Sequence, residues 1–337
     1  MVQEMTFPSI NHGYNRVFQP GRLSVGLVAP LENYPSGPVP SMERHLERAL
    51  LAERAGFSAL WLRDVPFNVP SFGDAGQVHD PFVYLGFLAA HTNSIALGVA
   101  SLVLPLRHPA HVAKAAASVD HLSNGRLILG IASGDRPDEY PAFRQNHANR
   151  GQRFRESVDY IRSMAESSPF TNSTFGHTSG DMDLLPKPLT GKIPLLITGS
   201  SQQHPQWAAN NGDGWITYPR DVDAQQTAVT QWRASIASED TFSRPVMQSL
   251  YVDLDDDPNV GPVPIHLAFR SGINALKKYL ESLEGIGVNH VALNLRFNRA
   301  NTETTIKQLA DELLPLFPSP ELPPCSLSAA PTIEVSP

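Results

Sequence analysis

The chain has 337 residues, with 26 Lys and Arg against 33 Asp and Glu, and its formal net charge of −7 argues against nucleic-acid binding, which needs a basic face. Its single cysteine, Cys325, excludes an intramolecular disulfide framework and any cysteine-based zinc or iron–sulfur site. Because no apolar run approaches the about 20 residues of a membrane span and the first 20 residues lack a signal-peptide core, we expect a soluble, cytoplasmic protein.

Short apolar runs alternate with segments of helical period along the whole chain. The runs are nearly continuous and rich in branched residues, which is typical of parallel strands covered on both faces. Eight strands are predicted, at Leu23–Ala29, Ala59–Leu62, Ile95–Leu104, Leu127–Ile131, Pro194–Thr198, Gly214–Thr217, Val246–Val252 and His290–Leu295. The helices that follow them are predicted at Ser41–Ala55, Pro81–His91, Pro109–His121, Gly151–Glu166, Gln203–Asn210, Asp223–Ala237, Ser271–Leu283 and Thr302–Leu314.

Eight strands, each followed by a helix, predict an α/β protein of the (β/α)₈ TIM-barrel class. Two loop insertions are expected, Asn68–Asp80 after the second strand and Pro169–Lys192 after the fourth strand and its helix. A doubly wound open sheet with a second domain is the rival, but no linker divides the chain before about Pro318. We therefore expect one barrel domain over residues 1–317 and a mobile tail, rich in Pro and Ser, over residues 318–337.

The carboxyl ends of the strands are where a barrel of this class carries its active site. The fifth strand ends in Gly199, Ser200 and Ser201, just before a helix, and such a turn suits a phosphate group. A turn that only caps the helix explains this segment equally well. Ser133, Gly134 and Arg136 repeat the pattern after the fourth strand, although a solvated loop is the simpler interpretation there.

Several catalytic motifs are missing from the sequence. There is no His-x-His pair and no His-Glu-x-x-His, so no metal site is predicted. No Gly-x-Gly-x-x-Gly follows a strand, and no Gly-x-Ser-x-Gly elbow is present. A dinucleotide fold and a serine hydrolase of that kind are therefore not supported.

Three blocks of sequence, Glu47–Val65, Ile95–Gly134 and Ile197–Trp215, together resemble the bacterial-luciferase-like flavin monooxygenases. The most specific part is "LPLRHP" followed by "AKAAASVDHLSNGR" and a strand that ends in Gly. "LWLRDVPF", "FGDAGQVHDP" and "GDRPDEYPAF" resemble a branch of luciferase-type oxidoreductases of unassigned substrate. The resemblance implies a (β/α)₈ barrel that binds FMN, receives it reduced from a separate flavin reductase, and uses O₂ to oxygenate a small organic substrate.

The resemblance also implies roles for individual residues. Ala100 and Ser101 match a bulge at the end of the third strand that supports the isoalloxazine ring and often contains a non-proline cis peptide. Ser133 and Gly134 match a position on the phosphate side. The main phosphate loop is matched by Gly199, Ser200 and Ser201.

The chain departs from the family pattern at positions that bear on the substrate. Relatives can have Arg where this chain has Ser133, so Arg136 or Arg153 is the expected countercharge of the phosphate. Some relatives carry a tyrosine in the fourth helix where this chain has Phe154. The second strand ends in Arg63–Asp64 instead of Glu or His.

Two residues are candidates for the chemistry itself. Asp64 is a candidate acid or base, with structural pairing as the alternative. Arg296, at the end of the eighth strand, is a candidate to bind an anionic substrate or the activated oxygen, with a salt bridge to a rim carboxylate as the alternative.

Three other functions stay open on the sequence alone. A branch of the same superfamily uses deazaflavin, and some relatives keep the barrel but lose the reaction. A phosphosugar-processing barrel without flavin would explain the Gly-Ser-Ser turn but not the "LPLRHP" block. Whether the chain forms a homodimer is likewise open.

Overall fold

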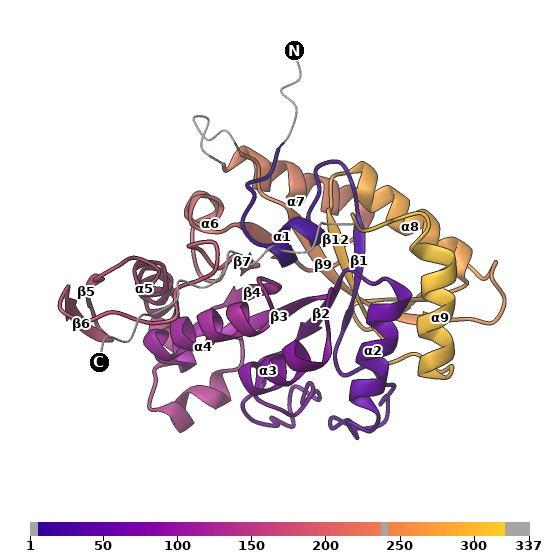
Figure 1. The fold of residues 1–337 in the computed structure, drawn as a ribbon. Coiled ribbons are helices and arrows are strands. Elements are labelled where there is room, and N and C mark those ends of the chain that lie inside the picture. The colour runs from indigo at the N-terminus through magenta and orange to yellow at the C-terminus, as the bar shows by residue number, and fades with distance from the viewer. Residues whose placement is uncertain (1–5, 237–241, 321–337) are drawn as a thin grey trace, which may run out of the picture.

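The computed structural model describes residues 6–236 and 242–320, and its centre is a closed barrel of eight parallel strands (Figure 1). β1 pairs with both β2 and β12, and β8 closes the ring by pairing with β9. The strands are β1 Ser24–Val28, β2 Ala59–Leu62, β3 Ala96–Val103, β4 Leu127–Ala132, β7 Leu195–Thr198, β8 Gly214–Thr217, β9 Val246–Leu254 and β12 His290–Asn294. The predicted TIM barrel is confirmed.

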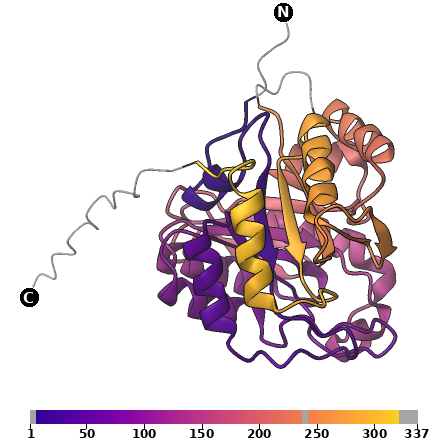
Figure 2. The same cartoon turned by 90° about the vertical axis from the view of Figure 1, so that its right-hand side faces the viewer.

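Eight helices cover the outside of the ring. They are α2 His45–Ala55, α3 Pro81–His91, α4 Pro109–Leu122, α5 Arg150–Ser163, α6 Pro205–Asn211, α7 Val222–Ala234, α8 Ile273–Gly285 and α9 Thr302–Leu313. The last helix, α9, lies beside α2, so the helical layer closes where the chain ends (Figure 2). Each was predicted, but α2 begins four residues late because Met42 and Arg44 adopt positive φ angles, which a helix excludes.

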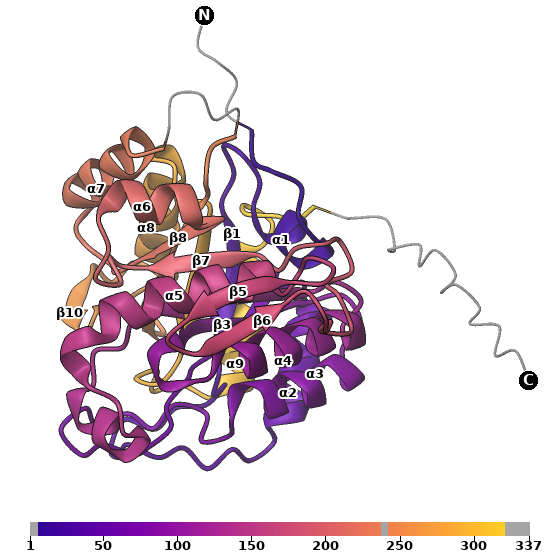
Figure 3. The same ribbon diagram turned by 90° about the vertical axis from the view of Figure 1, so that its left-hand side faces the viewer.

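One α-helix and four strands of the described residues were not predicted from the sequence. A short helix, α1 His12–Val17, lies against the amino-terminal ends of β3 and β4. A hairpin of β5 Phe170–Ser173 and β6 Gly176–Ser179 packs across the outside of α5 (Figure 3). A second hairpin, β10 Val263–Ile265 and β11 Ala268–Ser271, extends the far end of β9.

The interior of the barrel is filled by alternate residues of the strands. Ala96 and Ile128 point inward, whereas Leu97 and Leu129 pack against the helices. The fully buried Trp61 occupies the middle, and a Cβ atom on Gly98 would lie 2.4 Å from its ring. Glycine at position 98 therefore makes room for the largest side chain of the interior.

The two long insertions differ in position. Residues 68–80 lie at the carboxyl rim of the barrel and contribute to its cavity, whereas no residue of 169–192 lines that cavity. The second insertion packs outside α4 and α5, where His108 contacts the carbonyl of Phe175. Of the two predicted insertions, only Asn68–Asp80 therefore contributes to the cavity.

Some sequence predictions fall outside the described residues. Most of the predicted tail, with Cys325, lies there, as does Ala237 at the predicted end of the helix that becomes α7. Within residues 6–236 and 242–320, no helix is long and apolar enough to cross a membrane.

Candidate functional site

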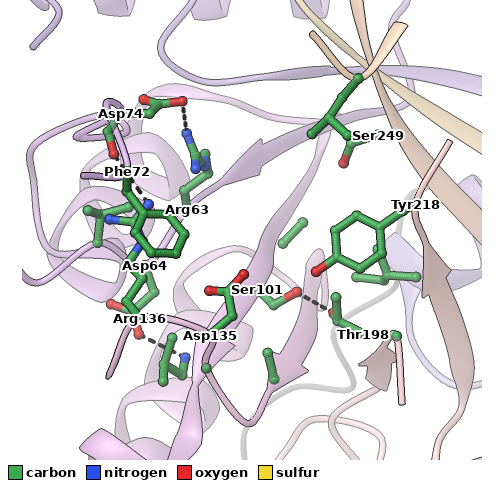
Figure 4. Close-up of a pocket in the computed structure, with 18 of the residues that line it drawn as sticks. Arg63, Asp64, Phe72, Asp74, Ser101, Asp135, Arg136, Thr198, Tyr218 and Ser249 are labelled. Atoms are coloured by element: carbon green, nitrogen blue, oxygen red, sulfur yellow. Dashed lines mark hydrogen bonds and ion pairs between the residues drawn. The ribbon is translucent and has the colours of Figure 1, made fainter. Parts of the chain in front are cut away.

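A cavity of about 630 Å³ opens at the carboxyl ends of the barrel strands. Its lining includes all of the residues predicted for the site except Arg153, namely Asp64, Ala100, Ser101, Ser133, Gly134, Arg136, Gly199, Ser200, Ser201 and Arg296. Arg63, Asp74 and Arg136 lie at one side of it, Thr198 and Tyr218 lie at the other, and Ser101 lies between them (Figure 4). The structure thus brings the predicted residues together, while their roles stay predictions.

The turn after β7 lines the cavity and contains backbone amides without a partner in the described structure. Gly199, Ser201 and Gln202 have φ angles of 55°, 45° and 61°. The amide of Gln203 donates to the carbonyl of Ser200 at 2.8 Å, which closes the turn. Within the described part of the chain, the amides of residues 200–202 have no acceptor. A run of such amides in a turn with positive φ angles forms an anion-binding concavity.

The start of α5 lies directly against this turn. A Cβ atom on Gly151 would lie 2.8 Å from the Cβ of Gln202, so only glycine permits this approach. The preceding residue, Arg150, lines the cavity, and no side chain caps the helix at Asn149. A helix start without a carboxylate and with a cation in its first turn favours an anion nearby.

The other candidate countercharge, Arg153, does not line the cavity. Its guanidinium stacks over Phe175 at 4.3 Å, and its Nε donates to the carbonyl of Pro105. Phe154 is fully buried and packs edge-on against Trp207. Because Arg153 is held by these contacts, Arg150 is the better candidate for a cation that lines the cavity near the turn.

The floor of the cavity is formed where β3 departs from regular pairing. The register between β3 and β4 shifts between Val99 and Leu102, and the Ala100–Ser101 peptide is cis. The bulge expected at this point is therefore present. The hydroxyl of Ser101 is hydrogen-bonded to that of Thr198, which ties the bulge to the end of β7.

Ser133 and Gly134 continue the floor after β4. Both are held from behind, since the Tyr140 hydroxyl donates to the carbonyl of Ser133. Gly134 has a φ angle of 79°, and a Cβ atom there would lie 2.7 Å from the Val103 side chain. Glycine is required at position 134, and the backbone beside it is accessible from the cavity.

Asp74 organises the opposite side of the cavity. Its carboxylate forms ion pairs with Arg63 and, at 2.9 Å, with Arg296, and it accepts hydrogen bonds from Tyr34 and Tyr251. Burial alone would raise the pKa of Asp74, but Arg63, the Gly76 amide and Arg296 hold it below its ordinary value. One carboxylate here therefore serves two guanidinium groups, those of Arg63 and Arg296.

Arg296 is committed to this network. Its Nη2 donates to the carbonyls of Gly37 and Gly73, and its side chain stacks over Tyr34 at 4.8 Å. The salt bridge to a rim carboxylate, weighed as the alternative for Arg296, is present.

Arg136 also lies on this side and not beside the turn after β7. Its Nη2 donates to the carbonyl of Asp74 at 3.3 Å, and its guanidinium stacks over Phe72 at 4.6 Å. Its nearest carboxylate, on Glu139, is 3.8 Å away, and burial raises the pKa of that carboxyl. The predicted contact of Arg136 with a cofactor phosphate stays a prediction.

Asp64 is a paired carboxylate. It accepts two hydrogen bonds from Arg107, at 2.7 and 3.0 Å, and a third from the amide of Val103 at 3.0 Å. Arg107 also contacts Asp80, the capping residue of α3. These bonds tie the ends of β2 and β3 to the start of α3, which is the pairing that was weighed as the alternative to acid or base catalysis.

Two residues of the site were missed in the sequence. Asp74 lies in the Gly-rich segment after β2, where nothing local indicates that it pairs with side chains from β2 and β12. Arg150 carried a usable signal, because a cation at the first position of a helix opposes the helix dipole.

Comparison with known proteins adds a family and named relatives. The family model described as luciferase-like monooxygenase matches residues 19–286. An uncharacterised protein of Mycobacterium tuberculosis is 31% identical over 194 residues, which are 53% of this chain and 68% of that protein. The F420-dependent hydroxymycolic acid dehydrogenase of the same organism is 29% identical over 246 residues, which are 71% of this chain and 65% of the dehydrogenase.

A solved structure shares the fold. It is the oxygenating constituent of 3,6-diketocamphane monooxygenase from Pseudomonas putida, in complex with FMN. The alignment has a TM-score of 0.69 and 15% sequence identity, and it covers 89% of this chain and 100% of that one.

Proposed function

Because the chain belongs to the luciferase-like monooxygenase family, we propose that it is an FMN-dependent monooxygenase whose flavin lies in the cavity at the carboxyl ends of the strands. One observation carries the proposal: residues 200–202, whose amides have no acceptor in the described part of the chain, line the cavity together with Arg150. Amides and a cation so arranged bind a phosphate monoester, which FMN has and riboflavin lacks.

The remaining residues fit the rest of the cofactor. From the turn, the cavity passes over the Ala100–Ser101 bulge, which offers a backbone ledge for a planar ring. Val28 and Ile216 line the cavity below this level with apolar side chains that exclude water. Tyr218 packs 3.5 Å from where a Cβ of Gly199 would stand and covers the turn from the side of β8.

When bound in reduced form, FMN supplies the electrons that activate O₂. The protein's own residues hold the phosphate at the turn, support the ring at the bulge, and leave the part of the cavity near Arg63 for a small organic substrate. In this proposal a separate flavin reductase provides the reduced cofactor.

The test compares FMN with riboflavin by quenching of flavin fluorescence. FMN is expected to bind roughly tenfold or more tightly, because charge-assisted hydrogen bonds to the phosphate contribute about 1.5–3 kcal/mol. Ser200→Asp should weaken FMN binding by placing a negative charge beside the phosphate, while Ser200→Asn serves as the uncharged control. Equal affinities for FMN and riboflavin would contradict the proposal.

A deazaflavin-dependent oxidoreductase is the second candidate, and a specific relative favours it: the dehydrogenase that matches 71% of this chain is named as F420-dependent. The two functions separate in one experiment. Reduced FMN, offered with aldehydes, ketones, sulfonates and alkanes, should drive substrate-dependent oxygen consumption in the monooxygenase. Tight F420 binding together with hydride transfer that does not need O₂ would establish the second candidate instead.

A further inference from the structure

The side of the cavity opposite the Ser200–Gln202 turn contains a cation with an unused binding edge. Arg63 lies at the end of β2, and its Nη1 donates a hydrogen bond to the carboxylate of Asp74. The side chain of Arg63 makes no other hydrogen bond to the described residues. Its Nε and Nη2 have no acceptor among the described residues, and neither is buried. The side chain is 22% exposed and lines the cavity. These two nitrogens form the edge with which a guanidinium grips a carboxylate in a bidentate pair.

The edge is held in a fixed orientation. Asp74, which receives the other end of the guanidinium, is itself fixed by Arg296, Tyr34 and the Gly76 amide. Figure 4 shows the Arg63 side chain directed toward Asp74, with Phe72 and Arg136 alongside. A cation whose rotamer is already set loses little conformational entropy when a ligand binds, so the site is pre-organised.

Two arginines on this side of the cavity, Arg63 and Arg136, act on each other through their charges. Arg63 and Arg296 share the carboxylate of Asp74, whereas the carboxylate nearest to Arg136 is that of Glu139, at 3.8 Å. The pKa of Arg136 is lowered, first by burial and then by the charge of Arg63, so the two cations repel each other. An anion placed between them would relieve this repulsion.

We infer that the substrate is a small organic anion, a carboxylate or a sulfonate, whose charged group is gripped by the free edge of Arg63 and faces Arg136. The inference rests on the proposed function, since it assigns the opposite end of the same cavity to the cofactor phosphate. The apolar body of the substrate then extends toward the Ala100–Ser101 bulge, where the reacting part of the flavin lies.

The test measures binding of hexane-1-sulfonate, hexanoate and hexan-1-ol to the FMN-loaded full chain by titration calorimetry. Both anions are expected to bind about tenfold to a hundredfold more tightly than the alcohol of the same length, the usual range for hydrogen bonds to a charged group. Arg63→Met should remove this preference, and Arg63→Lys should restore part of it, because it returns the charge without the bidentate edge.

Two further variants keep the result interpretable. Arg136→Met removes a guanidinium whose nearest carboxylate, on Glu139, is 3.8 Å away, and it should reduce the preference. Arg144→Met is the matched control, since Arg144 is exposed and does not line the cavity, and the substitution removes the same charge. If the alcohol binds as tightly as the anions, or if Arg63→Met and Arg144→Met behave alike, the inference fails.

The outcomes also separate this inference from the proposed function. If Arg63→Met weakens FMN binding as much as a change at the Ser200–Gln202 turn does, the Arg63 edge belongs to the cofactor and the inference is wrong. If FMN does not bind at all, the proposed function fails, and the same anion titration on the flavin-free chain still decides the inference. If FMN binds but the anions bind no more tightly than the alcohol, the inference is wrong and the proposed function is not affected.

Discussion

The two ends of the barrel differ in how their polar groups are hydrogen-bonded. At the amino end, α1 closes the interior, and its Asn11 cap donates to Asp120 and to the carbonyl of Leu127. The Tyr14 hydroxyl donates to the carbonyl of Asp213 at 2.8 Å. At the carboxyl end, the Ser200–Gln202 amides and the outer edge of Arg63 have no partner in the described structure.

The difference separates stability from binding. A polar group that is withdrawn from water without a partner destabilises the fold by about 1–3 kcal/mol, so the paired groups of the amino end contribute stability. Unpaired donors that line a cavity are kept hydrated until a ligand replaces the water. Changes at the amino end and in the interior should therefore alter unfolding, whereas changes at the carboxyl rim should alter ligand affinity.

The largest expected effect is at Gly98, because it would break the packed interior. Gly98→Val places a side chain where even a Cβ atom would lie 2.4 Å from the Trp61 ring. We expect a loss of about 3 kcal/mol or more in the free energy of unfolding, measured with urea. Gly86→Ala is the control, since nothing lies within 4 Å of a Cβ there and a helical alanine should stabilise by about 0.5–1 kcal/mol.

The next effect is a pH dependence that originates inside the barrel. Trp61 Nε1 donates to His290 Nε2 at 2.8 Å, so the proton of the neutral ring is on Nδ1, facing Ser24. Burial lowers the pKa of His290 from 6.5 to about 3, although a hydrogen bond from the ring to Ser24 opposes this. Below pH 6.5 the unfolded chain therefore binds a proton that the folded chain excludes.

Stability from this residue is complete above pH 6.5 and falls as the pH drops toward 3, by about 1.4 kcal/mol per pH unit. The expected loss at pH 5 is about 2 kcal/mol relative to neutral pH. Urea unfolding across this range should show a shallower pH slope in His290→Gln than in the natural chain. An unchanged slope would mean that His290 is protonated in the folded barrel.

A smaller effect on stability is expected at Asp64. This residue lies at the carboxyl end of the barrel, yet both of its oxygens have hydrogen-bond partners, so it tests whether pairing or position decides the effect. Asp64→Asn removes one of the two oxygens that hold Arg107, and we expect a loss of about 1–3 kcal/mol. Affinity for FMN should stay within about twofold, since Arg107 holds Asp64 away from a ligand role. A variant with normal stability but lost turnover would instead support the acid or base role.

The sequence predicted the parts of this molecule that local patterns determine. Strands covered on both faces give continuous apolar runs, so all eight barrel strands were found. α1 was missed because it has six residues and depends on distant partners, such as Asp120 and Asp213. A helix so short is not stable by itself, and no local sequence pattern predicts it.

In the candidate site, too, local features could be predicted from the sequence and long-range contacts could not. Residues directly after a strand, such as Gly199 and Ser133, could be assigned to the cavity because the fold class places every strand end there. The partner of each charge could not be assigned. Asp64 pairs with Arg107 and not with its neighbour Arg63, and Asp74 joins β2 to β12, because these contacts arise only when the ring closes.

The smallest expected effect tests the unsatisfied end directly. Arg150→Met removes a cation that lines the cavity together with the Ser200–Gln202 turn, and we expect FMN to bind about tenfold more weakly, or about 1.4 kcal/mol. Riboflavin affinity should not change, since riboflavin has no phosphate to lose its partner. Arg153→Met removes an equal charge one helical turn away, where the side chain stacks on Phe175, and should leave both affinities unchanged. Equal losses for FMN and riboflavin in Arg150→Met would show that the residue shapes the cavity instead of neutralising a phosphate.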